Sequence, residues 1–167
     1  MHNATRLYKL FNNQLTSKEL KFFFDTADST DELRVIAVHK KTTKFMLRKL
    51  AEHDDDCVKY YVANNENTSA SVLRELANNN VISIKVAVAK NSKTPLAVLK
   101  LLALDYDFHV RQNAFLNMID NHLNINVIKY LCIIEREYIK QLLTVNYSKL
   151  PIKIRKNKFI TLLLLGR

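Results

Sequence analysis

The stretch that decides the fold is Ile84–Ala103, which reads IKVAVAKNSKTPLAVLKLLA. It opens with an apolar face at helical spacing, formed by Ile84, Ala87 and Val88. Asn91 interrupts this pattern, and Thr94 is expected to be the N-cap of a second helix. Pro95 suits the first position of that helix, because a backbone N–H at that position would have no hydrogen-bond acceptor within the helix. The stretch therefore predicts two short helices joined by a tight turn.

The pattern recurs every 26 residues along almost the whole chain. The second helices share the blocks MLRKLA at 46–51, VLRELA at 72–77 and VLKLLA at 98–103. Three columns keep the same step: Thr16, Thr42, Thr68 and Thr94; Asn13, His39, Asn65, Asn91 and Asn117; and Leu10, Ile36, Val62, Val88 and Ala114. The sequence thus predicts one repeat domain over residues 1–167, with units 6–31, 32–57, 58–83, 84–109, 110–138 and 139–167.

The repeated residues, V-K/R-x-A-V-A-x-N-x-x-T-P-x-x-V-L-x-x-L-A, resemble the leucine-rich repeat variant family, a relative of HEAT repeats. The corner at 105–107 and the following Val110-Arg111 also resemble the D-x-D-x-x-V-R corner of HEAT repeats. The resemblance implies an all-α fold, a right-handed α-solenoid (superhelix) of about six short two-helix repeats. Founding members carry an N-terminal cysteine cluster for an iron–sulfur centre. Residues 1–56 contain no cysteine, so no cofactor is expected.

An ordinary leucine-rich repeat is the competing fold, because Val86, Val88 and Asn91 also fit its L-x-L-x-x-N pattern, which begins with a β-strand. That repeat needs an apolar residue two positions after the Asn. Three of the four repeats hold a polar residue there: Lys41, Asn67 and Lys93, against Ile119. Alanine, found at 87 and 89, is also a poor strand former. The sequence favours the all-helical fold.

Turns in this chain are expected to form without glycine. The only glycine is Gly166, which excludes glycine-rich phosphate-binding loops and the nucleophile elbow. Corners rich in Asp and Asn at 53–56, 78–80 and 105–107 end helices through side-chain hydrogen bonds to the backbone. Thr16 and Glu19 have the spacing of a capping box.

The net charge of +10 is concentrated near the C-terminus, where residues 136–167 hold eight Lys and Arg against one acid. The C-terminal basic cluster comprises Lys149, Lys153, Arg155, Lys156 and Lys158. Such a density can engage several phosphates and would make binding depend on salt. The alternative is a solvated terminal face that keeps the repeat array soluble.

A second basic cluster comprises Lys40, Lys41, Lys44, Arg48 and Lys49. It is followed by acids at 54–56, so an exposed helix face balanced by that corner is expected. The column of Lys59, Lys85 and Arg111 is expected to bond to neighbouring Asp or carbonyl groups. The Asn column is expected to satisfy carbonyl groups between repeats.

Catalytic and metal-binding patterns are missing. The five histidines lack zinc-binding spacing, and paired carboxylates occur only in corners. Tyr60 and Tyr61 beside Lys59 can stack on nucleotides, although such a pair is more typical of a core. No secretory signal is expected, and Phe159–Leu165 is too short to cross a membrane. Cys57 and Cys132 are expected to be buried, reduced thiols, which suits a cytoplasmic location.

These observations predict a non-enzymatic binding scaffold that engages an anionic partner, nucleic acid or an acidic protein surface, through the C-terminal basic cluster. One alternative is a protein–protein adaptor, self-associating through Phe159–Leu165. A second is a small HEAT-like nucleic-acid-modifying enzyme, although its DNA glycosylase relatives use aromatic side chains and the chain has no Trp. Salt-dependent binding to DNA or RNA distinguishes the first interpretation.

Overall fold

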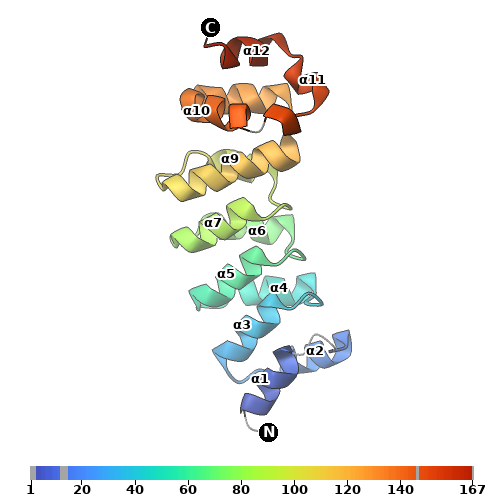
Figure 1. Ribbon diagram of the computed structural model, residues 1–167. Coiled ribbons are helices and arrows are strands. Elements are labelled where there is room, and N and C mark those ends of the chain that lie inside the picture. The colour runs from blue at the N-terminus through green and yellow to red at the C-terminus, as the bar shows by residue number, and fades with distance from the viewer. Residues whose placement is uncertain (1–2, 12–14, 146, 167) are drawn as a thin grey trace. The chain divides into compact units, whose positions relative to one another are not determined.

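All regular secondary structure is helical in the described part of the chain, residues 3–11, 15–145 and 147–166 of a computed structural model (Figure 1). The helices are α1 (Asn3–Phe11), α2 (Ser17–Asp25), α3 (Thr30–Val38), α4 (Lys44–Ala51), α5 (Asp56–Asn64), α6 (Ala70–Leu76), α7 (Ile82–Lys90), α8 (Leu96–Leu102), α9 (Phe108–His122), α10 (Ile125–Val145), η1 (Tyr147–Lys149), α11 (Ile152–Arg155) and α12 (Lys158–Leu164). The all-α prediction is confirmed, and the strand-containing alternative is wrong for these ranges. None of these helices is long and apolar enough to span a membrane.

The chain divides into two compact units, residues 1–117 and 118–167, and the division falls within α9. In the first unit α1, α3, α5 and α7 contact one another in succession, as Figure 1 shows. Each of these four helices is followed by a second helix, and α4 contacts α6 in this second series. One repeat domain over 1–167 stays a prediction.

The apolar columns of the repeat form the core of the first unit. The first helices contribute Leu10, Ile36, Val62 and Val88, and the second helices contribute Leu47, Leu73 and Leu99, all at most 1 % exposed. Burying each such side chain stabilises the fold by roughly 1.5–3 kcal/mol. Glu32 is the exception, because it is fully buried in the column that holds Val58 and Ile84. Its carboxylate pairs with Arg6, at 2.5 Å between Oε1 and Nε.

The Asn column forms a ladder of hydrogen bonds between successive repeats, as predicted. Asn65 Nδ2 donates to the carbonyl oxygens of Ala37 at 2.7 Å and His39 at 3.2 Å. Asn91 does the same to Ala63 and Asn65, and Asn117 to Ala89 and Asn91, at 2.7–3.1 Å. Asn13 and Asn146 of the predicted column lie outside the described residues. The ladder, defined as Asn65, Asn91 and Asn117, joins each first helix to the one before it.

Beyond Thr16, which caps α2, the Thr column does not cap the second helices of the repeats. Thr94 lies one residue before the N-cap, which is Pro95, and Thr42 and Thr68 also precede the N-caps of α4 and α6. Their buried hydroxyl groups donate backwards, to the carbonyl oxygens of Ile36, Val62 and Val88 at 2.5–2.6 Å. The threonines therefore satisfy carbonyl groups at the end of each first helix. Only the capping box of Thr16 and Glu19 is confirmed.

Side chains close the corners where glycine would otherwise be needed. His53 Nδ1, Asn79 Oδ1 and Asp105 Oδ1 each accept a hydrogen bond from the backbone N–H two residues later, at 2.7–2.9 Å. Asp55 and Asp107 then cap α5 and α9 by accepting from the N–H groups of Val58 and Val110. The corners thus form as the composition predicts.

The second unit is built differently. α10 is 21 residues long and is interrupted at Glu135, whose φ of −143° and ψ of 69° are not helical. α12 contacts both α10 and the four-residue α11. The core of this unit includes Ile128, Leu131, Ile139, Leu143, Ile160 and Leu163. α12 is therefore held by packing against α10, and α11 by packing against α12.

Candidate functional site

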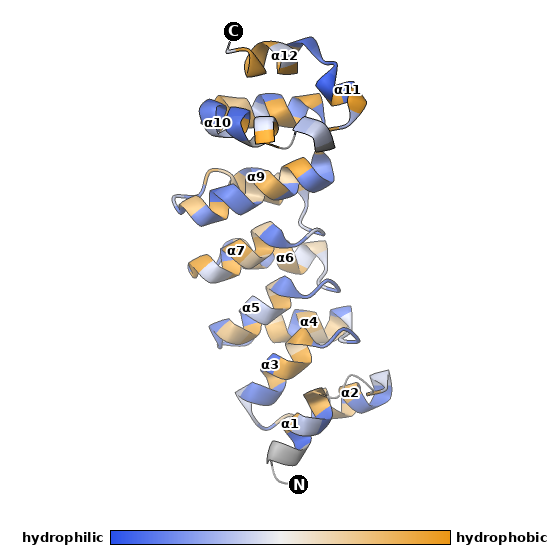
Figure 2. Cartoon of the chain, in the orientation of Figure 1, coloured by the Kyte–Doolittle hydropathy of each residue, from blue (hydrophilic) through white to orange (hydrophobic). Residues whose placement is uncertain are grey.

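The C-terminal basic cluster lies in the second unit, on α11 and the start of α12. Lys153, Lys156 and Lys158 are exposed, and none has an acidic partner among the described residues. Asn157 separates two of them and caps α12, with Oδ1 accepting from the Phe159 N–H at 2.9 Å. The turn between α11 and α12 is blue in Figure 2, whereas most of α12 is orange. The structure thus brings three of the predicted cations together at an exposed corner.

The other two members of this cluster differ from the three lysines. Arg155 is half-buried, and no described group is hydrogen-bonded to its Nε. Its backbone carbonyl accepts from the Tyr147 hydroxyl at 3.4 Å. The side chain of Lys149 lies outside the described residues. Arg155 is therefore less available to a partner than the sequence indicates.

Lys129 joins this corner from α10, which the sequence did not predict. Its Nζ lies 5.7 Å from the centroid of the Phe159 ring, the residue after Lys158. A cation over an aromatic face is attracted by the negative face of the ring. Lys129 and Lys158 are 29 residues apart in the sequence. The position of Lys129 beside the cluster therefore depends on the packing of α12 on α10 and could not be predicted from sequence spacing.

The second basic cluster occupies the α3–α4 turn and α4, and all five of its side chains are exposed. Lys49 pairs with Glu52 at 3.2 Å, and Lys41 Nζ donates to the carbonyl oxygen of Leu15 at 2.6 Å. The remaining three, Lys40, Lys44 and Arg48, have no acidic partner in the ranges described. They form a second exposed cationic surface.

The second basic cluster forms the exposed face that was predicted, but two acids of the following corner pair with other cations. Asp55 pairs with Arg34 at 2.6 Å, and Asp56 lies 3.9 Å from Lys59. The Arg34 hydrogen bond and the Val58 N–H hold the pKa of Asp55 at about 2. The corner therefore neutralises the first helices of the repeats and not α4.

The cationic column at Lys59, Lys85 and Arg111 has the structural role that the sequence predicted. Lys85 is 9 % exposed and pairs with Asp105 at 2.7 Å. Arg111 Nη1 donates to the carbonyl oxygens of Asp105 and Tyr106, both at 2.9 Å. Burial by itself would raise the pKa of Asp105, but the Lys85 hydrogen bond, the Asp107 N–H and nearby cations lower it overall. These cations are used within the fold.

Several single residues differ from their predicted burial. Tyr60 is exposed and Tyr61 is half-buried, with ring centroids 5.4 Å apart, so the pair does not belong to the core. Cys57 is exposed and Cys132 is half-buried, where burial raises the pKa of the Cys132 thiol. No group of three His, Cys, Asp or Glu side chains is placed to hold a metal ion in the described ranges.

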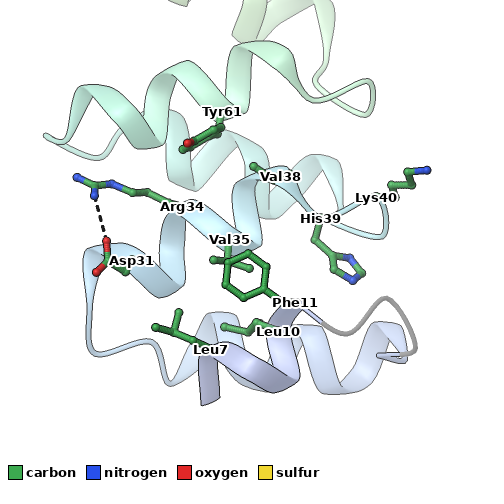
Figure 3. Close-up of a pocket in the computed structure, with 10 residues that line it drawn as sticks. All are labelled: Leu7, Leu10, Phe11, Asp31, Arg34, Val35, Val38, His39, Lys40 and Tyr61. Carbon is green, nitrogen blue, oxygen red and sulfur yellow. Dashed lines mark hydrogen bonds and ion pairs between the residues drawn. The ribbon is translucent and has the colours of Figure 1, made fainter. Parts of the chain in front are cut away.

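A pocket of about 760 Å³ lies on α1 and α3 in the first unit (Figure 3). We refer to it as the α1–α3 pocket. Its apolar lining consists of Leu7, Leu10, Phe11, Val35 and Val38. Asp31 and Arg34 lie at one end, joined by an ion pair of 3.0 Å, and His39 and Lys40 lie at the other. Tyr61 reaches the pocket from α5. Sequence reasoning did not identify this site.

Comparison with known proteins gives no assignment: no family model, no curated protein and no solved structure matches the chain. Membership of the leucine-rich repeat variant family stays a prediction from the repeated motif.

Proposed function

We propose that the chain is a non-enzymatic, cytoplasmic binding scaffold, a right-handed α-solenoid of helix pairs, that binds nucleic acid through the C-terminal basic cluster. The observation that supports binding is the exposure of Lys153, Lys156 and Lys158 without acidic partners among the described residues. A cation whose charge is not used within the fold is free to replace the counterions of a phosphate. The exposed Cys57 suits a reducing compartment.

The solenoid is supported by the ladder in the first unit. Asn65, Asn91 and Asn117 each bind the carbonyl groups 26 and 28 residues earlier, with nearly the same distances. Identical contacts between successive repeats require a nearly constant step from one to the next, which is how solenoids are built.

Nucleic acid is favoured over an acidic protein surface because an aromatic side chain lies beside the cations, as it does on surfaces where bases stack. The exposed members of the cluster are lysines, and the single arginine is half-buried. A lysine ammonium binds phosphate as a point charge and does not need the bidentate geometry that arginine offers to phosphate and carboxylate alike. Phe159, with Lys129 over its ring, adds a half-buried aromatic side chain beside the cations.

The test is the affinity for single- and double-stranded oligonucleotides at 50 and 200 mM salt, measured by fluorescence anisotropy and gel shift. With three phosphate contacts, the affinity should fall roughly 20- to 40-fold over this interval. The triple variant Lys153→Glu, Lys156→Glu, Lys158→Glu should abolish binding. Its control reverses three exposed cations of the first unit, Lys9, Lys90 and Lys93, and so changes the net charge equally. Equal loss in both variants, or binding that ignores salt, rejects the proposal.

A protein–protein adaptor is the second candidate, favoured by exposed apolar side chains in the second unit. Ile133, Val145, Ile152 and Leu165 are all more than 60 % exposed. Within the predicted self-association segment Phe159–Leu165, Ile160 and Leu163 are buried, which leaves Leu162 and Leu165 exposed. Light scattering of the variant Leu162→Lys, Leu165→Lys tests self-association through this helix: a dimer lost on substitution supports it. The enzyme alternative has no supporting observation.

A further inference from the structure

The apolar wall of the α1–α3 pocket departs from the repeat pattern. Leu7 occupies the column that holds Lys59 and Lys85 in later repeats, and Val38 occupies the column of Asn64 and Lys90. Phe11 stands where the next three repeats have the buried alanines Ala37, Ala63 and Ala89, and it is 70 % exposed, whereas Phe115 in the same column is buried. Val38 is 55 % exposed. Apolar side chains therefore face solvent at positions where the third and fourth repeats use polar or small residues.

His39 is a further departure at the same place, because every later member of the Asn column to which it belongs is Asn. Its Nδ1 accepts a hydrogen bond from the Lys41 backbone N–H at 3.1 Å. The ring is therefore neutral, with its proton on Nε2. Burial and the charge of Lys41 also lower the pKa of His39, which keeps it neutral.

The Nε2–H of His39 is a donor without an acceptor. His39 is only 6 % exposed and lines the pocket, and no described group accepts from Nε2. In the next repeat Asn65 uses its amide on two carbonyl oxygens, so the same position is satisfied there. A buried donor left unpaired costs free energy, which a bound acceptor would recover.

Charge differs between the two ends of the pocket. At one end Arg34 is paired twice, with Asp31 at 3.0 Å and with Asp55 at 2.6 Å. At the other end Lys40 has no acidic partner among the described residues, while Lys41 bonds to a carbonyl oxygen and interacts electrostatically with Glu19. The end that holds the unpaired donor is therefore also the end with an unpaired cation, Lys40, which favours an anionic acceptor.

We propose that the α1–α3 pocket binds a small aliphatic carboxylate. The carboxylate accepts the Nε2–H of His39 near Lys40, and the aliphatic chain lies against Leu7, Phe11 and Val38. The volume of about 760 Å³ lies within the range of small-molecule sites. An apolar lining with a few polar groups is also typical of such sites. This site belongs to the first unit and does not depend on nucleic-acid binding by the second.

Calorimetric titration with three probes of equal chain length tests the proposal: decanoate, decan-1-ol and decyltrimethylammonium, each below its micelle concentration. Decanoate should bind with one site per chain and at least roughly tenfold more tightly than the alcohol, because a charged acceptor strengthens the His39 hydrogen bond. The cationic probe should bind weakest. Equal affinities for the three probes would overturn the proposal, since they would show only apolar adsorption.

Two substitutions that install the residue of later repeats test the assigned contacts without threatening the fold. His39→Asn places an amide that can extend the ladder and no longer offers a donor to the pocket. Phe11→Ala removes the largest apolar side chain of the wall. Each should weaken decanoate binding roughly tenfold or more, with an unchanged circular dichroism spectrum. The matched control is Phe45→Ala, which removes an equally exposed aromatic on α4.

The remaining outcomes decide between this and other occupants. Unchanged affinity in both variants, or an equal loss in Phe45→Ala, contradicts the assigned site. A peptide with an apolar C-terminal residue that binds more tightly than decanoate would show a protein partner instead, and would also overturn the proposal. Loss of decanoate binding with oligonucleotide binding retained shows that the two sites are separate.

Discussion

The two units of this protein use their positive charge in different ways. Residues 1–117 hold 17 Lys and Arg against 13 Asp and Glu, and residues 118–167 hold nine against three. In the first unit, cations of the first helices pair with acids, as in Arg6–Glu32, Arg34–Asp55 and Lys85–Asp105. In the second, Lys153 and its neighbours have no such partner among the described residues. The first helices of the repeat use charge to hold the repeat together, whereas the exposed lysines of α11 and α12, like Lys40, Lys44 and Arg48 in the first unit, keep their charge unpaired among the described residues.

The largest expected effect comes from the core of either unit. Leu73→Ala in the first and Leu131→Ala in the second should each lower the free energy of unfolding by about 2–5 kcal/mol, since both side chains are fully buried. If the units form one repeat array, both variants shift the same urea transition. Two separate transitions, each sensitive to one variant, would contradict a single array. Leu101→Ala, at an exposed position, is the control.

The ladder should be the next most sensitive feature of the first unit. Asn91→Ala removes the donor to two buried carbonyl groups and the acceptor of the Lys93 N–H, at a cost of about 2–3 kcal/mol. Asn64→Ala, one residue earlier in its own repeat and exposed, should change stability by less than about 0.5 kcal/mol. Chemical denaturation of both variants gives the comparison, and equal losses would deny the ladder its role.

The contrast between paired and unpaired lysines can be measured directly. Lys85→Met removes the ion-pair partner of the largely buried Asp105 carboxylate and should cost about 1–3 kcal/mol at pH 7. Lys153→Met should cost less than about 0.5 kcal/mol. Because the folded-state pKa of Asp105 is lowered, the pair stabilises above the ordinary Asp pKa and is lost as pH falls. The Lys85 defect should therefore shrink below about pH 4, and a defect constant with pH would contradict the pair.

The smallest effect concerns the corner at Asp55, whose pKa is lowered to about 2, first by its hydrogen bond from Arg34. A lowered pKa means that its contribution is complete above the ordinary Asp pKa and is lost as pH falls from about 4 towards 2. Asp55→Asn keeps the helix cap but removes the charge. Melting temperatures of the two proteins should differ at pH 6 and converge near pH 2. If the two melting temperatures instead fall in parallel as the pH is lowered, other acidic residues control the acid sensitivity.

Repetition explains what could be predicted from the sequence. The apolar columns, the ladder at Asn65 and the role of Lys85 follow from residue types that recur at one spacing, since a repeated type implies a repeated environment. The capping role predicted for the Thr column holds at Thr16 but is wrong for Thr42, Thr68 and Thr94. Their hydroxyl groups donate to carbonyl oxygens six residues earlier, and nothing in the spacing distinguishes that bond from an N-cap.

What the sequence missed lies where repetition fails or where distant residues meet. Asp55 pairs with Arg34, 21 residues earlier, and not with the cations of α4, which are nearer in the sequence. Lys129 reaches Phe159 only because α12 packs on α10. The sequence does contain a signal for the α1–α3 pocket. Leu7, Val38 and His39, all within the first repeats, differ in residue type from the members of their columns in the third and fourth repeats. Departures from the repeat pattern therefore indicate a candidate site, whereas the pattern itself indicates the fold.

The ladder has a consequence for how such a chain can change in length. Asn91 binds the carbonyl groups of Ala63 and Asn65, and Asn117 binds those of Ala89 and Asn91, so every step spans 26 residues. Deleting residues 66–91 would bring the Asn117 amide to Ala63 and Asn65, the same two acceptors that Asn91 uses. A gene encoding this unit can therefore gain or lose whole repeats by recombination without inventing a new contact, whereas a deletion of any other length breaks the register.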